Sequence, residues 1–189
     1  MINDRAVQRV LAAVVALGAV TVACLLFDVS RLADGSVRLD ILDAGQGDSL
    51  LLTTPQGLRV LIDGGTDGRA LRSLGWRLPT ADQRVDMIVL THPHRDHLVG
   101  LPALVRRGGV RWALLGGTPS GTYEYAAFLE SLAQAGTTVI PADPTTMIDL
   151  GDNLSLDVLW PPAESYGQPW SGDINDASVT LALRWYGQC

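Results

Sequence analysis

The sequence predicts a domain in which a β-sheet packs against helices, of the α/β or α+β class. Three observations lead to this prediction. Short strand-like segments joined by hairpin turns come first, strands then alternate with helices, and an apolar N-terminal segment stands apart from both. The chain has 189 residues, enough for one domain with a hydrophobic core, and 47% of them are hydrophobic. This composition excludes a disordered chain.

The N-terminal segment has the composition of a membrane-spanning helix. Apolar or small residues run without a charge from Val10 to Phe27. As a helix this run would be about 27 Å long, close to the roughly 30 Å of a bilayer's hydrocarbon core. Arg5 and Arg9 precede it, and flanking cations favour the cytoplasmic side of a membrane.

These features predict a single-pass protein of the cell membrane. We expect residues 1–9 in the cytoplasm, residues 10–27 as a transmembrane helix or uncleaved signal anchor, residues 28–36 as a linker, and residues 37–189 as an extracytoplasmic domain. A cleaved signal peptide, a lipoprotein cut before Cys24 and a buried core helix are the alternatives.

The domain opens with a strand in which Val37, Leu39 and Ile41 alternate with polar residues. We therefore expect a half-buried strand, with these three side chains on its buried face. The elements that follow are read from apolar periodicity and from Gly and Pro breakers. We expect strands at 49–53, 59–63, 85–90, 110–115, 138–141, 154–160 and 178–186, and helices at 69–76, 98–107 and 122–135.

The loop after the strand at 85–90 contains all three histidines of the chain, in the stretch from Thr91 to His97. His92 and His94 are two residues apart, so in extended backbone both rings leave on one side and can hold one divalent ion. Asp96 and His97 follow where a helix begins and can hold a second ion. A polar loop with chance histidines is the alternative, but their density favours a metal site.

Charge limits how a nucleic acid could bind. The formal net charge is −6, and the sequence contains no basic tract that would hold a nucleic acid by charge alone. If a nucleic acid is the substrate, a metal must supply the local positive charge. Imidazole and carboxylate ligands suit zinc or manganese, and the sequence does not distinguish the two.

The pattern H-x-H-x-D-H after an apolar strand, preceded by the strand end Asp63-Gly64, resembles the metallo-β-lactamase superfamily. The resemblance implies an αββα sandwich and two divalent metal ions held by the four residues His92, His94, Asp96 and His97. It also implies that Asp96 orients the nucleophile, as a catalytic residue. Asp63 would then support the metal loop by hydrogen bonds without binding metal.

A narrower resemblance lies in two other segments. The stretch from Asp43 to Ser49 is similar to the D-V-G-Q-G-D-S signature of the ComEC family of DNA-internalisation proteins, with Ala44 as the one departure. The segment from Asn175 to Ser178 is similar to the N-x-x-S segment of that family. This resemblance gives Gln46, Asp48 and Asn175 supporting roles. It implies DNA or another phosphodiester as substrate, and other competence membrane proteins as partners.

The chain also departs from the superfamily. It has no histidine after His97. The superfamily also has a Gly-Asp at the end of a later strand, whose carboxylate bridges the two metals, and then a last histidine, and neither appears at the corresponding place in this chain. We therefore expect residues 37–189 to be the N-terminal part of an incomplete domain, and the chain alone to be a poor or inactive enzyme. Two other functions stay open. One is a hydrolase of the same fold acting on a lactam, thioester or small phosphate ester, and the other is a non-catalytic, membrane-anchored relic.

Overall fold

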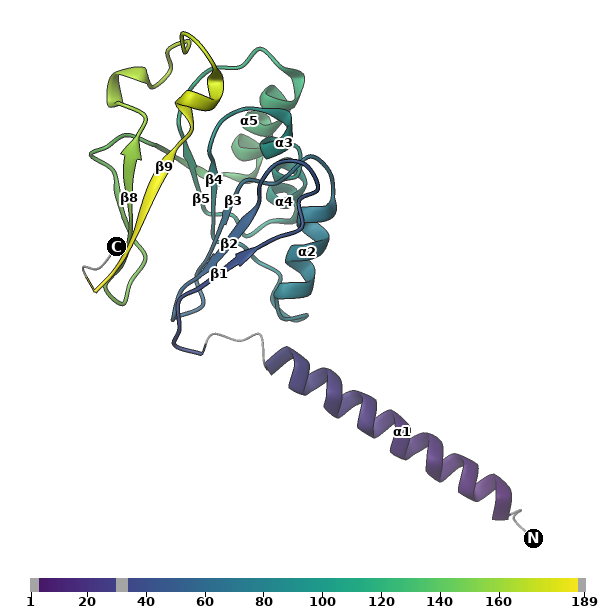
Figure 1. The fold of residues 1–189 in the computed structure, drawn as a ribbon. Coiled ribbons are helices and arrows are strands. Elements are labelled where there is room, and N and C mark those ends of the chain that lie inside the picture. Colours follow the sequence, from purple (N-terminus) through teal and green to yellow (C-terminus); the bar gives the residue numbers. More distant parts are fainter. Residues whose placement is uncertain (1–3, 30–33, 187–189) are drawn as a thin grey trace.

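A computed structural model describes residues 4–29 and 34–186, and shows helices and two sheets stacked in layers beside a projecting N-terminal helix (Figure 1). The first sheet has six strands in the order β1-β2-β3-β4-β5-β6. They are β1 (Arg38–Ile41), β2 (Leu50–Thr53), β3 (Arg59–Ile62), β4 (Met87–Leu90), β5 (Trp112–Leu115) and β6 (Thr138–Pro141). The first three strands pair antiparallel, and β3 to β6 pair parallel.

The second sheet is antiparallel and has the order β7-β8-β9. Its strands are β7 (Met147–Asp149), β8 (Leu154–Trp160) and β9 (Thr180–Trp185). Two short 3-10 turns, η1 (Ala163–Ser165) and η2 (Ile174–Ala177), lie in the connection between β8 and β9. This connection reaches back toward the first sheet, because the backbone N–H of Val179 donates to the carbonyl of Thr91 at 2.9 Å.

Two hydrophobic cores hold the layers together. One lies between the first sheet and the helices α2 (Arg69–Arg77), α3 (Arg95–Leu98), α4 (Leu101–Arg107) and α5 (Tyr123–Ala135), and contains the fully buried Phe128. The other lies between the two sheets, where Val60 of β3 and Leu114 of β5 pack with Leu154 of β8. The mixed α/β class predicted from the sequence is confirmed. In Figure 1 helices α2 to α5 all lie on one side of the first sheet, so the described residues form a helix–sheet–sheet arrangement.

The expectation for the first strand is wrong in one respect. Leu39 and Ile41 of β1 are not half-buried, because 55% and 78% of their surfaces are exposed. Leu39 lies opposite Leu52 of β2, and Leu52 is buried in the core between the two sheets. The second sheet therefore covers the middle of the first sheet but leaves its β1 edge open.

The helix expected at 98–107 is also different. It is divided into α3 and α4, and α3 already begins at Arg95, so Asp96 and His97 lie in a helical turn. The division falls at Gly100, where a Cβ atom would lie 2.1 Å from the carbonyl oxygen of Gly64. Only a glycine allows the two backbones to approach this closely.

Helix α1 (Asp4–Val29) contains the segment predicted to span a membrane. Within it, the segment Val7–Val29 has a mean hydropathy of 2.7 and is not buried against the rest of the described residues. By length and composition it is a candidate membrane span, and one such helix near an N-terminus is weak evidence by itself. Residues 30–33 of the predicted linker lie outside the described residues.

Candidate metal centre

The histidine loop begins at the carboxyl end of β4, in the middle of the first sheet. Thr91 follows the strand directly, and His92 is buried with 5% of its surface exposed. His94 occupies the N-cap position of α3 in extended backbone, and the helical turn then carries Asp96 and His97. A buried parallel strand and a short helix therefore fix the backbone on both sides of the loop.

The three imidazole rings lie close together. The ring centroid of His92 lies 4.7 Å from that of His94 and 4.2 Å from that of His97. Nε2 of His92 lies 3.1 Å from Nδ1 of His94, and Nε2 of His97 lies 3.7 Å from Oδ2 of Asp96. The four predicted ligands thus form two donor pairs, one of two nitrogens and one of nitrogen and oxygen.

Asp63 lies beneath these pairs and is 1% exposed. Its Oδ1 accepts a hydrogen bond from the backbone N–H of Thr91 at 2.9 Å, and its Oδ2 accepts from Oγ1 of Thr91 and from Nδ1 of His97, both at 2.7 Å. Its φ of 59° lies in the left-handed region, which Asp adopts more readily than most residues. The turn after β3 thus places one buried carboxylate within hydrogen-bond distance of both Thr91 and His97.

These contacts determine which ring nitrogens carry protons. A carboxylate only accepts hydrogen bonds, so Nδ1 of His97 donates to Asp63 and Nε2 keeps its lone pair. Thr91 gives its single hydroxyl proton to Asp63 and can only accept from Nδ1 of His92, which lies 3.0 Å away. With a proton on Nδ1, Nε2 of His92 has a lone pair that accepts a hydrogen bond from Nδ1 of His94 in the metal-free protein. Asp63 therefore prepares His97 directly, and His92 through Thr91, to bind a cation.

The environment shifts the pKa of two histidines in opposite directions. Burial lowers the pKa of His92, and the neighbouring His97 and His94 lower it further. Burial would also lower the pKa of His97, but the hydrogen bond to Asp63 and the negative charges of Asp63, Asp96 and Asp48 outweigh burial and raise it. The site thus favours a neutral His92, whereas His97 keeps its second ring proton to a higher pH than an ordinary histidine does.

The glycine-rich loop after β1 packs directly against the histidine loop. A Cβ atom at Gly47, whose φ is +85°, would lie 1.9 Å from the carbonyl oxygen of Asp96. Asp48 and Asn175 line one open pocket together with Asp63, His92 and His97. Gln46 does not line that pocket; it is exposed, and its backbone carbonyl accepts a hydrogen bond from Thr66.

Two residues of the site had no role in the sequence-based prediction. Thr91 connects Asp63 to His92, and Oγ of Ser178 lies 3.1 Å from Nδ1 of His92. The sequence did contain a signal for each, because Thr91 opens the histidine stretch and Ser178 ends the N-x-x-S segment. Neither signal predicts that the hydroxyls of Thr91 and Ser178 would both lie next to Nδ1 of His92.

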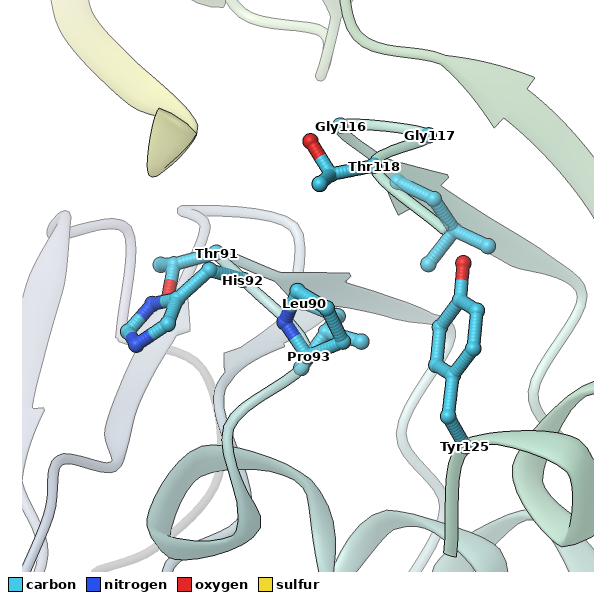
Figure 2. A pocket seen from close by; sticks show the side chains of 9 residues that line it. Leu90, Thr91, His92, Pro93, Gly116, Gly117, Thr118 and Tyr125 are labelled. Atoms are coloured by element: carbon cyan, nitrogen blue, oxygen red, sulfur yellow. The ribbon is translucent and has the colours of Figure 1, made fainter. Parts of the chain in front are cut away.

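A small second pocket lies behind His92, at the carboxyl ends of β4 and β5 (Figure 2). Pro93, Thr118 and Tyr125 form part of its wall. The hydroxyl of Thr118 is buried and has no hydrogen-bond partner among the described residues. Burial raises the pKa of Tyr125, and the nearby Tyr166 adds to the effect. His92 lines both pockets, and this second pocket contains no acidic side chain, unlike the open pocket that contains Asp48 and Asp63.

The spacing of one donor pair fits two ligands of a divalent cation. Two ligands of a tetrahedral zinc ion, each about 2.0–2.1 Å from the metal, lie roughly 3.3 Å apart, close to the 3.1 Å between the facing nitrogens of His92 and His94. Within residues 4–29 and 34–186, no group of three or more His, Cys, Asp and Glu side chains is arranged to hold one ion. The described residues therefore offer each ion two protein ligands from the histidine loop.

Comparison with known proteins identifies the family of this chain. A sequence model of the metallo-β-lactamase superfamily matches residues 42–167, which include the glycine-rich loop and the histidine loop. The chain belongs to this superfamily. The resemblance seen in the sequence is confirmed at that level.

Individual relatives match this chain over shorter segments. It is 40% identical over 58 residues to ribonuclease Z of Clostridium botulinum, covering 30% of this chain and 17% of the relative. It is 32% identical over 84 residues to exodeoxyribonuclease WalJ of Streptococcus pneumoniae, covering 44% and 28%. It is 37% identical over 67 residues to microtubule-associated protein 1A of Rattus norvegicus, covering 35% and 2%. The chain thus spans less than a third of each of these relatives.

Among solved structures, the Rm3 metallo-β-lactamase superposes with a TM-score of 0.49 and 19% sequence identity, covering 86% of this chain and 60% of the other.

Proposed function

We propose that this chain is a metal-dependent phosphodiesterase of the ComEC-like branch that acts on DNA. The observation that carries the proposal is the pair of donor sets on one loop, with His92 and His97 oriented by the single buried carboxylate of Asp63. Similarity to a ribonuclease and to an exodeoxyribonuclease supports a nucleic-acid substrate. The glycine-rich segment Asp43–Ser49 and the Asn175–Ser178 segment support the ComEC-like branch.

Each residue of the site has a separate role in this proposal. His92 and His94 would hold one ion, and Asp96 and His97 the other, with zinc and manganese both compatible with these ligands. Two bound divalent ions supply a nucleophile at neutral pH by lowering the pKa of water. Asp96 is half-exposed and would also orient that nucleophile. Asp48 and Asn175 line the open side of the pocket, where they would face the substrate.

The direct test is hydrolysis by the full chain in detergent, with manganese or zinc added. Single-stranded DNA and a chromogenic phosphodiester are the substrates, and a lactam and a thioester are the comparisons. We expect cleavage of the phosphodiesters only, at a low rate because each ion has two protein ligands. His94→Ala should abolish it, while Glu130→Ala, on the exposed face of α5, should not. Cleavage of the lactam or thioester alone would overturn the phosphodiesterase assignment.

Metal content tests the same ligands independently of activity. The full chain and a His92→Ala/His94→Ala double variant are dialysed against zinc or manganese and analysed for bound metal. We expect the double variant to retain less metal, because one donor pair is gone. Equal metal content in both proteins would contradict the assignment of these ligands and would favour the non-catalytic relic.

We also propose that α1 anchors the domain in the cell membrane through residues 10–27, with the domain on the extracytoplasmic side and competence membrane proteins as partners. The apolar, unburied helix supports an anchor, and Arg5 and Arg9 at its start support this orientation. Reporter fusions after Ser36 test it. We expect a fusion to an enzyme that works only outside the cytoplasm to be active. Activity of a cytoplasmic reporter alone would reverse the topology.

A further inference from the structure

The end of the first sheet opposite the histidine loop carries a group of arginines, which we call the basal arginines. Parallel strands all begin at one edge of a sheet, and the helices that precede them end there. The side chains at these strand starts and helix ends are therefore neighbours. The basal arginines are Arg38, Arg77, Arg84, Arg106, Arg107 and Arg111, and all are exposed or half-exposed. They are six of the 14 basic residues of a chain whose net charge is −6.

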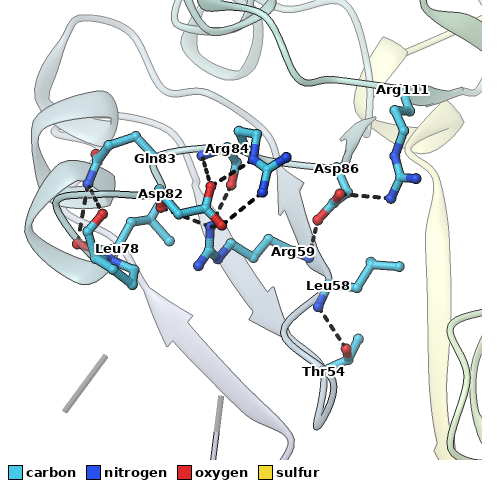
Figure 3. A network of polar contacts seen from close by, with 10 residues as sticks. Thr54, Leu58, Arg59, Leu78, Asp82, Gln83, Arg84, Asp86 and Arg111 are labelled. Carbon is cyan, nitrogen blue, oxygen red and sulfur yellow. Dashed lines mark hydrogen bonds and ion pairs between the residues drawn. The ribbon is translucent and has the colours of Figure 1, made fainter. Parts of the chain in front are cut away.

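Carboxylates orient four of the six guanidinium groups. Arg84 pairs with Asp82 at 2.8 Å, and Arg111 pairs with Asp86 at 2.8 Å (Figure 3). Asp40 of β1 pairs with Arg77 at 2.9 Å and with Arg38 at 3.5 Å. These pairs fix the guanidinium groups at the edge of the sheet without burying them.

Positive charge remains in excess at this end. Arg106 and Arg107 end α4, and no carboxylate of the described residues lies within ion-pair distance of either. With the buried Arg59 there are seven cations at the base of the first sheet, against the four carboxylates Asp28, Asp40, Asp82 and Asp86. The excess in the first sheet is three, and it falls to one when the two aspartates of the second sheet at this end are included. Asp149 and Asp152 lie at the same end of the second sheet, beside the turn that contains Gln56.

The apolar helix α1 ends at this same surface. Asp28 is the first carboxylate after the apolar run, and its Oδ1 accepts hydrogen bonds from the backbone N–H of Thr80 at 3.1 Å and from Oγ1 of Thr80 at 2.9 Å. Thr80 lies between Arg77 and Arg84 in the sequence. Since the end of a membrane helix lies at the level of the lipid headgroups, Thr80 and the arginines beside it would lie there too.

We propose that the basal arginines rest on the membrane that holds α1 and bind the phosphates of anionic phospholipid headgroups. Guanidinium groups bind phosphate oxygens with two parallel hydrogen bonds and remain charged at any physiological pH. A nucleic acid would offer the same phosphate chemistry. The lipid is favoured because the apolar helix ends at this surface, whereas the histidine loop lies at the opposite edge of the sheet. The proposal rests on the membrane insertion of α1 proposed above.

The test measures how close this surface comes to the headgroups. The full chain, with Cys24→Ser and Cys189→Ser, receives a fluorophore at Ala81→Cys, an exposed position next to Thr80. A second protein carries the fluorophore at Ala126→Cys on α5, near the histidine-loop end, where Glu124 pairs with Arg95. Both are reconstituted into vesicles of phosphatidylcholine alone, or with phosphatidylglycerol added, that contain a lipid with a nitroxide on its headgroup.

We expect quenching at position 81 to be stronger with phosphatidylglycerol and to fall as salt is added, with little change at position 126. We call the domain docked when its basal arginines contact the headgroups, and we obtain the ratio of docked to undocked domain from the quenching at position 81. An Arg106→Gln/Arg107→Gln variant should lower this ratio by about fivefold for each arginine. The matched variant Arg69→Gln/Arg72→Gln, which removes two arginines at the other end of α2, should leave the ratio unchanged.

Three results would overturn the proposal. One is equal quenching at position 81 in both vesicle types, and another is unchanged docking of the Arg106→Gln/Arg107→Gln variant. The third is displacement of the docked domain by a single-stranded oligonucleotide that binds the parent chain but not this variant, since this surface would then bind nucleic acid. Flotation with phosphatidylcholine vesicles tests insertion separately. A chain that does not float refutes the anchor, and one that floats without charge-dependent docking refutes the lipid contact.

Discussion

The two ends of the first sheet use charged residues in opposite ways. At the histidine-loop end a single buried carboxylate, Asp63, accepts three hydrogen bonds and orients His97 directly and His92 through Thr91. At the basal end Asp82 and Asp86 pair with exposed arginines in contact with solvent. The comparison indicates that the rigidity of each end of the sheet does not follow from the number of charges there. Burial makes the contacts at the histidine-loop end specific, whereas water screens those at the base.

The largest effect expected from this comparison is that of Asp63→Ala. Removing the buried carboxylate leaves the hydroxyl of Thr91 and a ring nitrogen of His97 without an acceptor. We expect the free energy of unfolding to fall by about 3 kcal/mol and bound metal to be lost. Urea unfolding in detergent, followed by tryptophan fluorescence, measures the first effect. Asp67→Ala, at an exposed aspartate paired with Arg69, is the control, and an equal loss in both variants would contradict the comparison.

Gly47→Ala should have the next largest effect. The added Cβ would lie 1.9 Å from the carbonyl oxygen of Asp96, so one of the two loops must move. A displacement near 1 Å typically costs about a hundredfold in the function of a site, and we expect metal affinity to fall by that order. Isothermal titration with zinc provides the measurement. Gly121→Ala, where a Cβ atom meets nothing within 4 Å, should bind zinc as the parent does, and the same affinity in both variants would show that the loops are not coupled.

Metal uptake should depend on pH through His97 more than through His92. Because the pKa of His97 is raised above its ordinary value of 6.5, a metal ion must displace a proton from it even above that pH. The lowered pKa of His92 means that this ring is already neutral there. We expect affinity to fall by about tenfold for each pH unit below the pKa of His97. Zinc titrations between pH 6 and pH 8, values that span the ordinary range of histidine, test this, and a constant affinity would contradict it.

The same shift has a consequence for stability without metal. A histidine whose pKa is raised in the folded state stabilises the fold below its ordinary pKa, and this stabilisation disappears as pH rises through the raised value. For His92, whose pKa is lowered, the sign is the reverse, and its contribution disappears as pH falls. The two contributions therefore change on opposite sides of pH 6.5, and from these two groups the free energy of unfolding of the metal-free chain in urea should be greatest near that pH.

The smallest effect is expected at the base. The hydrogen bond from Arg84 lowers the pKa of Asp82 from 3.8 to about 2, although burial opposes the shift. The stabilisation from this carboxylate is present above pH 3.8 and disappears as pH falls toward 2. Asp82 pairs with the exposed Arg84 and also lies 3.4 Å from the buried Arg59, so Asp82→Asn should cost about 1 kcal/mol at neutral pH and nothing near pH 2. A loss as large as that of Asp63→Ala would show that the basal network is as rigid as the site.

Much of the site was predictable because its residues are close in sequence. The spacing of His92, His94, Asp96 and His97 follows from one strand end and one helical turn, and the structure brings all four together. Helix α5 was also predictable, because Thr122 caps it and Gly136 ends it. Such local signals do not depend on the rest of the fold.

The remaining features depend on contacts between distant segments. The alternation of Leu39 and Ile41 predicts a buried face, but whether that face is covered depends on how far the second sheet extends. The break between α3 and α4 at Gly100 does have a local signal, because Pro102 stands in the first turn of α4 and cannot donate the hydrogen bond that would continue α3. The close approach of Gly64 at that point is a contact between distant segments, and the sequence near residue 100 does not reveal it. Strand β7 was not expected, since three residues carry too short a pattern to read.

The contact between Ser178 and His92 has a consequence for the time course of synthesis. The two residues are separated by 86 positions in the chain. At about 5–20 residues per second a ribosome needs roughly 4–17 s to add the second after the first. Throughout that interval the histidine loop already exists but lacks the hydroxyl of Ser178 and the backbone partner that Val179 gives to Thr91. If the loop binds metal as proposed, it is complete in sequence several seconds before its contacts with Ser178 and Val179 can form, and an ion bound during that interval would be held without them.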